Sequence, residues 1–194
     1  MLFFGALGMN PTDNGGISSM RQMSVAVLSM VLLPGAVLAQ TESNPVSNAV
    51  RASLARQTKN VIAAAQAMPA DKYGSRPTPE QMTFGHLILH IVGEDTLLCS
   101  KISGMPAPTM DKVADTDPKD QILAVLQTSV DFCAQAMARV DDSNLGEQLP
   151  LFGGRMASRA QAMVNLAADL SDHYSLAATE LRMAGVTPPS AIRK

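Results

Sequence analysis

Three histidines and one aspartate have the types and spacing that metal chemistry requires. His86 and His90 stand four residues apart in the apolar stretch FGHLILHIVGED, and His173 follows Asp169 by four residues in DLSDHYS. On a helix, residues four apart share a face, so Asp169 and His173 can address one point between helices. If His90 on another helix meets them there, two imidazoles and a carboxylate form a site for zinc, nickel, iron(II) or manganese, with positions left for water or substrate. Spacing alone leaves the alternative of unrelated core or surface histidines open.

Other polar side chains stand near these candidates in the sequence. Glu94 follows His90 by one helical turn, so it can orient the imidazole or act as a base, the alternative being a solvated carboxylate near the helix end. His86 is expected beside the metal ligands rather than among them. Glu180 and Arg182 are expected on a solvated face or in a local ion pair.

Four helical stretches must position these residues. Apolar spacings of three, four and seven residues predict helices at about 49–68, 79–104, 117–140 and 156–184, and no strand pattern competes. Two longer connections are expected, at 102–117 and 141–155. The predicted fold is all-α, an antiparallel four-helix bundle within about 47–186, with Tyr174 in its core.

Local signals set the expected helix ends. Thr78 is expected to cap the second helix, with Pro79 at its first position. Asp117 and Pro118 have the same roles at the start of the third helix. Gly185 is a natural C-terminal stop for the fourth, because glycine readily adopts the left-handed conformation that ends many helices.

Residues 1–39 are interpreted as a leader that is removed on export. A Sec-type signal peptide is predicted at 20–39, with a basic start at Arg21, an apolar run at 23–33, and small residues Val37 and Ala39 before the cleavage point. Residues 1–19 fit neither a signal nor a packed element, which favours a mis-assigned start codon. The apolar run is too short for a stable membrane span. The protein is therefore expected to be periplasmic or secreted in a bacterium, as a single domain of residues 40–194.

Export changes the interpretation of the two cysteines. In an oxidising compartment, Cys99 and Cys133 are expected to form a disulfide between the second and third helices, the alternative being two buried free thiols. The net charge of −2 and the lack of a basic cluster give no support for nucleic-acid binding.

Two segments resemble the DinB superfamily of four-helix-bundle proteins. They are KYGSRPTPEQMTFGHLILHIV and DHYSLAATELRMAGVTPPS, and the resemblance extends from about residue 47 to residue 190. Their details are similar to those of an exported branch of the family. Characterised members of the superfamily are metal-dependent and often transfer small thiols or isomerise their adducts. The resemblance therefore implies a DinB-like bundle with a divalent metal ion as cofactor.

The resemblance also implies a ligand set. The usual triad of the family is one histidine from the second helix and an H-x-x-x-H pair from the last. His90 matches the first, His173 matches the last, and Asp169 stands where the first histidine of the pair is usual. An aspartate there would alter the geometry, the metal preference and the acidity of bound water.

Two classes of function follow from these patterns. The first is a metal-dependent enzyme, a hydrolase or small-thiol transferase, that acts on a small-molecule substrate. The second is a non-catalytic bundle for binding or stress protection, in which the metal site is degenerate. A homodimer is left open as the oligomeric state.

Overall fold

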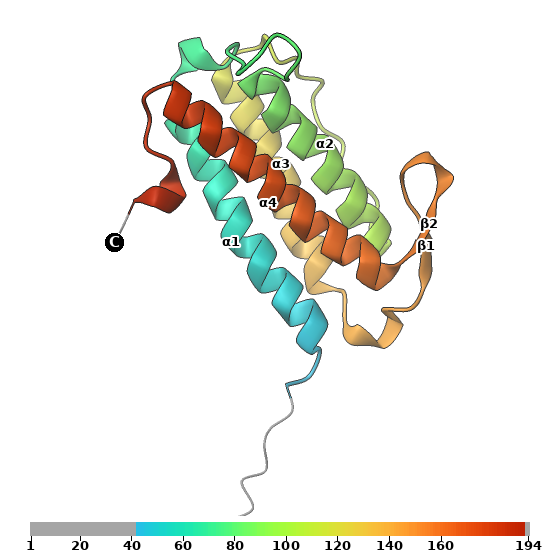
Figure 1. Ribbon diagram of the computed structural model, residues 1–194. Coiled ribbons are helices and arrows are strands. Elements are labelled where there is room, and N and C mark those ends of the chain that lie inside the picture. The colour runs from blue at the N-terminus through green and yellow to red at the C-terminus, as the bar shows by residue number, and fades with distance from the viewer. Residues whose placement is uncertain (1–41, 193–194) are drawn as a thin grey trace, which may run out of the picture. The chain divides into compact units, whose positions relative to one another are not determined.

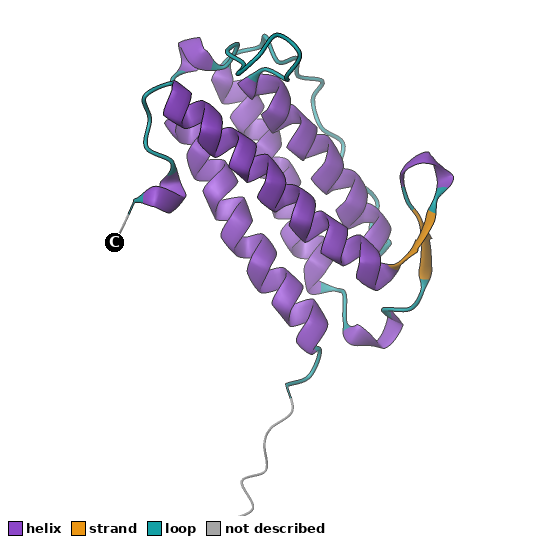
Figure 2. Cartoon of the chain, viewed as in Figure 1, coloured by secondary structure: helices purple, strands orange, loops and turns teal. Residues whose placement is uncertain are grey.

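The computed structural model describes residues 42–192, and four helices form most of this part of the chain (Figure 1). They are α1 (Pro45–Ala67), α2 (Phe84–Ser103), α3 (Lys119–Ala138) and α4 (Arg159–Met183). Figure 2 shows how little of the fold is strand: β1 (Gln148–Pro150) and β2 (Met156–Ser158) form one small hairpin. The predicted all-α class with four helices is confirmed. The predicted signal peptide and the segment before it lie outside the described residues.

The helices form a square in which α2 packs chiefly on α3 and α1 chiefly on α4. Contacts of α2 with α4 and of α1 with α3 close the square, and the colours in Figure 1 show the direction of each helix. No helix within residues 42–192 combines the length and the apolar character that crossing a bilayer requires.

Not every neighbouring pair is antiparallel, which corrects one detail of the predicted fold. Thr96 hydrogen-bonds Ser129, and one turn further on Cys99 is bonded to Cys133, so α2 and α3 run in the same direction. A parallel pair needs a connection that returns along the length of α2, about 30 Å. Residues 104–118 can span roughly 50 Å when extended, which is ample. The long connection predicted there is what permits this topology.

The pair α1 and α3 is antiparallel, as predicted. Arg51 near the start of α1 donates to the carbonyl oxygens of Met137 and Val140 at the end of α3, at 3.1 and 2.7 Å. At the other end, Lys119 Nζ at the start of α3 donates to the carbonyl oxygen of Met68 at 2.7 Å. These charged groups donate to carbonyl oxygens at the C-terminal ends of α3 and α1, where the helix leaves acceptor capacity free.

The start of α1 lies four residues before the predicted one. The residue before α1 does not cap the helix with its side chain. The carboxylate of Asp142 accepts instead from the backbone N–H groups of Val46 and Ser47, at 2.9 and 2.8 Å. Asp142 follows α3 in the chain, so this cap comes from a distant segment and could not be seen in the local pattern.

The start of α2 is also different from the prediction, because Thr83 rather than Thr78 caps the helix. Thr83 Oγ1 accepts from the backbone N–H of His86 at 3.1 Å. The first N–H of the helix, that of Phe84, binds the carbonyl oxygen of Ser75 at 2.9 Å. The segment around Thr78 forms a separate turn instead, so Pro79 is not in the helix.

Asp117 does not cap α3. Its carboxylate accepts from the N–H of Ala114 at 2.8 Å, inside the preceding loop, and the helix begins at Lys119 after Pro118. The carboxylate therefore shapes the loop rather than the helix.

The hairpin takes up the first residues of the predicted fourth helix. Gln148 pairs with Ser158, and Pro150 with Met156, in antiparallel register. Ser158 then caps α4 by accepting from the N–H of Gln161 at 3.2 Å. Three-residue strands are too short for alternation to reveal them, which explains the error.

The predicted end of α4 and the core position of Tyr174 are confirmed. Gly185 has a φ of 76°, and the N–H of Val186 closes the turn on the carbonyl oxygen of Leu181 at 2.8 Å. Tyr174 is buried, and its hydroxyl donates to Ser190 Oγ at 2.7 Å, which ties the segment after the helix to the bundle.

The predicted disulfide is present between α2 and α3. The α-carbons of Cys99 and Cys133 are 5.2 Å apart, within the range that a bridge requires. It closes a loop with a sequence separation of 34. A loop of that size stabilises the fold by roughly 3–4 kcal/mol in the chain-entropy model.

We therefore expect the double substitution Cys99→Ser and Cys133→Ser to lower the free energy of unfolding by about 2–4 kcal/mol, measured by urea denaturation. Reductant should destabilise the wild type to a similar extent and leave the variant unchanged. Two alkylated thiols in native protein that was never exposed to reductant would contradict the bridge.

A close approach at Gly85 fixes the loop before α3 against α2. A Cβ atom on Gly85 would lie 2.8 Å from the carbonyl oxygen of Asp115, whereas a Cβ on Gly93 in the same helix would meet nothing within 4 Å. We expect Gly85→Ala to destabilise the fold by about 1–3 kcal/mol in urea unfolding, because backbone must move. The matched control Gly93→Ala should be neutral or stabilising by up to about 1 kcal/mol. Equal effects of the two changes would refute the close contact.

Candidate metal centre

Three side chains that can ligate a metal meet where α2 and α4 face each other. His90 and Glu94 lie one turn apart on α2, and His173 faces them from α4. Glu94 Oε2 is 3.6 Å from His90 Nε2 and 3.5 Å from His173 Nδ1. The two imidazole rings are nearly perpendicular, with centroids 5.0 Å apart. One donor atom from each of the three residues lies within 4.8 Å of the other two, so His90, Glu94 and His173 form a single cluster.

The spacing of the donors fits a metal ion. In a tetrahedral site with bonds of about 2.1 Å, two donor atoms are roughly 3.4 Å apart, close to the two distances from Glu94. Two imidazole nitrogens and a carboxylate oxygen are a donor set that suits zinc, iron(II), nickel or manganese. The exposed fractions of the side chains are 39% for His90, 22% for Glu94 and 14% for His173, so the cluster is accessible from the His90 side.

One oxygen of the Glu94 carboxylate has no hydrogen-bond partner. Its Oε2 is buried and accepts no hydrogen bond from any residue in the described range 42–192. Burial lowers the pKa of His173 below its ordinary value, against the opposing effect of the nearby Glu94 charge. The neutral imidazole is thereby favoured, which is the form that binds a metal. A neutral His173 does not compensate the negative charge of Glu94. A positive ion between them would compensate that charge.

Asp169, which the sequence predicted as the third ligand, is not part of the cluster; the carboxylate beside the two imidazoles is that of Glu94, predicted as a possible base. Both residues lie one turn from a histidine, but glutamate has one more methylene and reaches further. Asp169 still acts on the site through its charge, which opposes the lowering of the His173 pKa by burial. It lies beside the cluster rather than in it.

Asp95 is a buried acid that the sequence did not single out. Burial, together with the charges of Glu94 and Asp169, raises the pKa of Asp95 to about 7. Three carboxyl groups therefore interact around two imidazoles. Asp95 follows Glu94 directly in an apolar stretch, and its place on the buried face of α2 was the available signal.

His86 lies outside the cluster. It is exposed, with Nδ1 3.7 Å from Asp115 Oδ2, and Thr83 Oγ1 donates to the same carboxylate at 3.1 Å. The histidine borders an open groove of about 560 Å³ that also reaches His90 and Glu94. The predicted role of His86 beside the ligands remains a prediction.

The groove runs along α2 between the loop before α3 and the hairpin. Its lining combines polar side chains, among them His90 and Glu94 of the cluster, with apolar ones. The apolar members are Leu89, Leu97, Val113 and Phe152. A molecule lying in this groove would therefore contact the exposed side of the candidate metal centre.

The fold and this cluster define a helical bundle with a candidate metal centre between α2 and α4. The family model described as the DinB superfamily matches residues 53–177, so the chain belongs to the DinB superfamily. This confirms the resemblance seen in the sequence.

A solved structure, a DinB-like protein from Bacillus cereus, has a similar fold. It has a TM-score of 0.60 and 16% sequence identity, and the alignment covers 73% of this chain and 95% of that one. At that identity the likeness concerns the fold. A search of curated proteins gave no match.

We expect zinc to bind metal-free protein with one ion per chain and to stabilise it. At a free concentration 100 times the Kd, the gain is about 2.7 kcal/mol. For a domain of this size that gain corresponds to a rise in Tm of roughly 5–10 °C. His90→Ala and His173→Ala should abolish the rise in a thermal-shift measurement, because each removes a donor.

His86→Ala is the matched control, since it removes an exposed histidine of the same helix that lies outside the cluster. This variant should keep both the stoichiometry and the rise in Tm. An equal response of all three variants to zinc would show that the ion binds elsewhere.

Proposed function

We propose that the protein is a metal-dependent enzyme of the DinB superfamily, of the hydrolase or small-thiol transferase type. His90, His173 and the carboxylate of Glu94 would hold one divalent ion, with Asp169 as a second carboxylate beside it. The resemblance to the family supplies the reaction types. The chemistry that a bound ion would supply is the activation of water or of a substrate thiol as a nucleophile.

The observation that carries this proposal is the unpartnered Glu94 oxygen between two imidazoles. A buried carboxylate oxygen that accepts no hydrogen bond is unfavourable unless a cation lies beside it. Here it is held 3.5–3.6 Å from two imidazole nitrogens. A divalent ion would satisfy all three donors at once. A purely structural role does not explain why the carboxylate oxygen is held between two imidazoles without a hydrogen bond.

The groove supports a small-molecule substrate. Its lining includes the polar residues His90 and Glu94 and the apolar residues Leu97 and Phe152. A substrate with one polar reacting group and one apolar portion would match this lining. We propose that the reacting group faces His90, the most exposed member of the cluster.

We further propose that the protein acts outside the cytoplasm of a bacterium. The Cys99–Cys133 disulfide supports this, because such bridges persist mainly in oxidising compartments. The leader interpreted from residues 1–39 supplies the route.

The activity itself is tested with metal-free and reconstituted protein. We expect hydrolysis of a nitrophenyl ester, or addition of a small thiol to an electrophile, only after zinc, nickel, iron(II) or manganese is restored. His86→Ala should be active, whereas His173→Ala should not. Stoichiometric metal binding without turnover of either substrate class would instead support the non-catalytic alternative.

The identity of the third ligand is tested with three carboxylate variants. Glu94→Gln keeps the shape but removes the charge, so it should weaken zinc binding at least about 100-fold in calorimetry. Asp169→Asn should weaken it less than about 10-fold, because this residue acts only through its charge. Asp169→His should preserve or tighten binding, since it restores the H-x-x-x-H pair usual in the family.

Reversed effects of Glu94→Gln and Asp169→Asn would identify Asp169 as the ligand and Glu94 as the neighbouring group. Helical circular dichroism of each variant separates a lost ligand from a lost fold. Unchanged affinity in both neutral variants would refute a carboxylate ligand altogether.

A further inference from the structure

Another buried carboxylate, that of Glu180, lies two turns along α4 from His173. The prediction from its charge, a solvated face or a local ion pair, was wrong: the residue is only 5% exposed. Its Oε2 accepts no hydrogen bond within residues 42–192. Burial alone raises the pKa of Glu180 to about 7, so no charged side chain compensates it. Arg182, its exposed neighbour, donates instead to the carbonyl oxygen of Ala178 at 3.2 Å.

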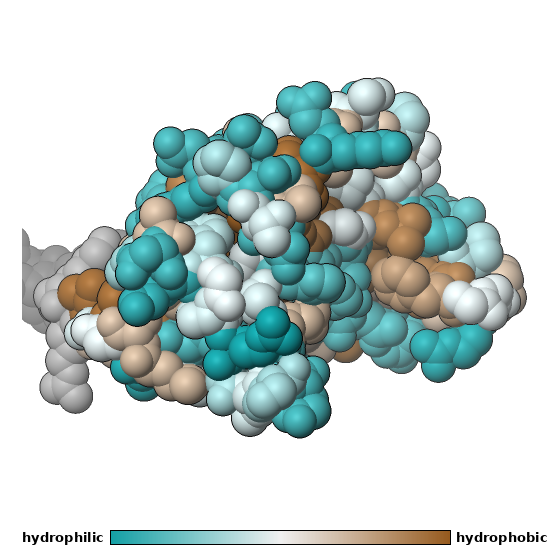
Figure 3. Space-filling view, turned by 90° about the horizontal axis from the view of Figure 1, so that it is seen from above, coloured by the Kyte–Doolittle hydropathy of each residue, from teal (hydrophilic) through white to brown (hydrophobic). Residues whose placement is uncertain are grey.

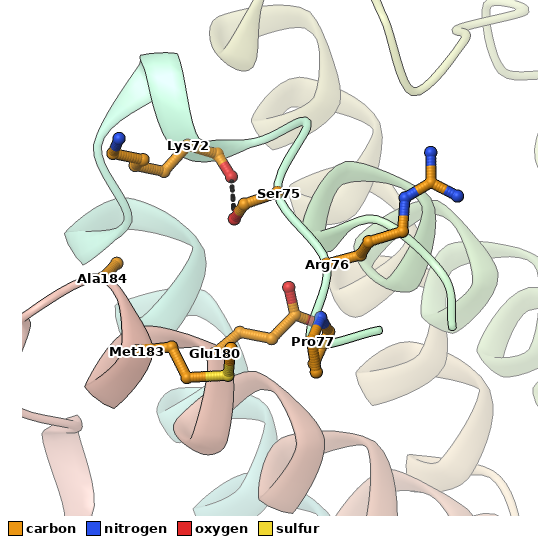
Figure 4. Close-up of a pocket in the computed structure, with 7 residues that line it drawn as sticks. All are labelled: Lys72, Ser75, Arg76, Pro77, Glu180, Met183 and Ala184. Atoms are coloured by element: carbon orange, nitrogen blue, oxygen red, sulfur yellow. Dashed lines mark hydrogen bonds between the residues drawn. The ribbon is translucent and has the colours of Figure 1, made fainter. Parts of the chain in front are cut away.

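Glu180 lines a cavity of about 210 Å³ at the end of the bundle where α1 ends and α4 ends. Figure 4 shows its side chain extending from α4 toward Pro77, with Lys72, Ser75 and Arg76 on the facing segment. Met183 adds an apolar contact from α4. None of these residues borders the groove at the candidate metal centre, so the cavity is a separate place.

The rim of the cavity is basic, but its cations have other partners. Arg76 Nη1 donates to the carbonyl oxygen of Pro79 at 3.2 Å, and Lys72 Nζ lies 3.6 Å from Asp71 Oδ2. Both side chains are on exposed residues and can turn toward the cavity. Seen from this end, the surface in Figure 3 is largely hydrophilic, and apolar residues gather on the lobe at the right.

Charge of both signs restricts what the cavity can hold. A plain anion would be repelled by Glu180, and a plain cation would be repelled by Lys72 and Arg76. A divalent metal has only one carboxylate here, because the only cluster of metal-ligating side chains within the described part of the chain is the one around Glu94. A small molecule that carries an ammonium and a carboxylate satisfies both sides at once.

We propose that this cavity binds a small zwitterion of the amino-acid class. The ammonium group donates to the Glu180 carboxylate, which thereby gains the hydrogen bonds and the counter-charge that it lacks. The carboxylate of the ligand accepts from Lys72 and Arg76 at the rim. Met183 and Pro77 leave room for no more than a short apolar side chain.

The probe is glycine, titrated by calorimetry into the full protein at pH 8. We expect saturable binding in the millimolar range, and at least 10-fold weaker binding of methylamine and of acetate, each of which carries one of the two charges. Glu180→Gln should weaken glycine binding at least 10-fold while keeping the fold, since it removes a buried charge. The double variant Lys72→Met and Arg76→Met should weaken it several-fold.

Asp120→Asn is the matched control, because Asp120 is an exposed acid in the first turn of α3, near this end of the bundle, that does not line the cavity. It should bind glycine as the wild type does. No saturable heat up to about 50 mM glycine, or equal binding by Glu180→Gln, would overturn the proposal. Equal binding of glycine and methylamine would overturn its zwitterionic part.

Discussion

The packing of α2 between α3 and α4 is the constraint on which the rest of the molecule depends. Its apolar face, with buried Leu98, Cys99 and Ile102, must lie against α3, while His90 and Glu94 must face α4. A parallel pairing with α3 meets both needs but separates the end of α2 from the start of α3 by the length of a helix. The returning loop then crosses the start of α2 and becomes one wall of the groove. The parallel pairing of α2 with α3 thus determines both the packing of the core and which side of the cluster is accessible.

The electrostatics of the α2–α4 interface do not balance within the described residues. Burial favours the neutral form of His173 and so removes a positive charge that could have compensated Glu94. Asp95 and Asp169 add two further carboxyl groups, and burial together with the neighbouring charges raises the pKa of Asp95 to about 7. Such an excess of carboxyl groups destabilises a bundle that could have used apolar side chains here. The disulfide and the continuous apolar core provide stability that can offset it, which makes a ligand-binding role a better account of these acids than a structural one.

Local signals predicted the helices well and their first residues poorly. Gly185 was correctly predicted as a stop because a left-handed glycine is a property of the chain itself. Thr78 was wrongly predicted as a cap, because the first N–H groups of α2, those of Phe84 and Gly85, bind the carbonyl oxygens of Ser75 and Tyr73, which only the folded chain brings there. Asp142 shows the same effect at α1, where it acts across the bundle. The direction of α3 relative to α2 likewise depends on the path of a loop, which periodicity does not contain.

The candidate site shows where residue type and spacing disagree. Spacing and resemblance predicted His90, Asp169 and His173 as the ligands, with Glu94 only as an orienting group or base. In the structure Glu94, not Asp169, has a donor atom close to both imidazoles. Glu180 was assigned to solvent because it is charged, although it lies seven residues after His173 and three after buried Ala177, on the inward stripe of α4. The helical periodicity, and not the charge, therefore predicted that Glu180 is buried. An acid that the helical pattern directs inward, with no basic residue one turn away to pair with it, is therefore a stronger indicator of a binding site than its residue type alone.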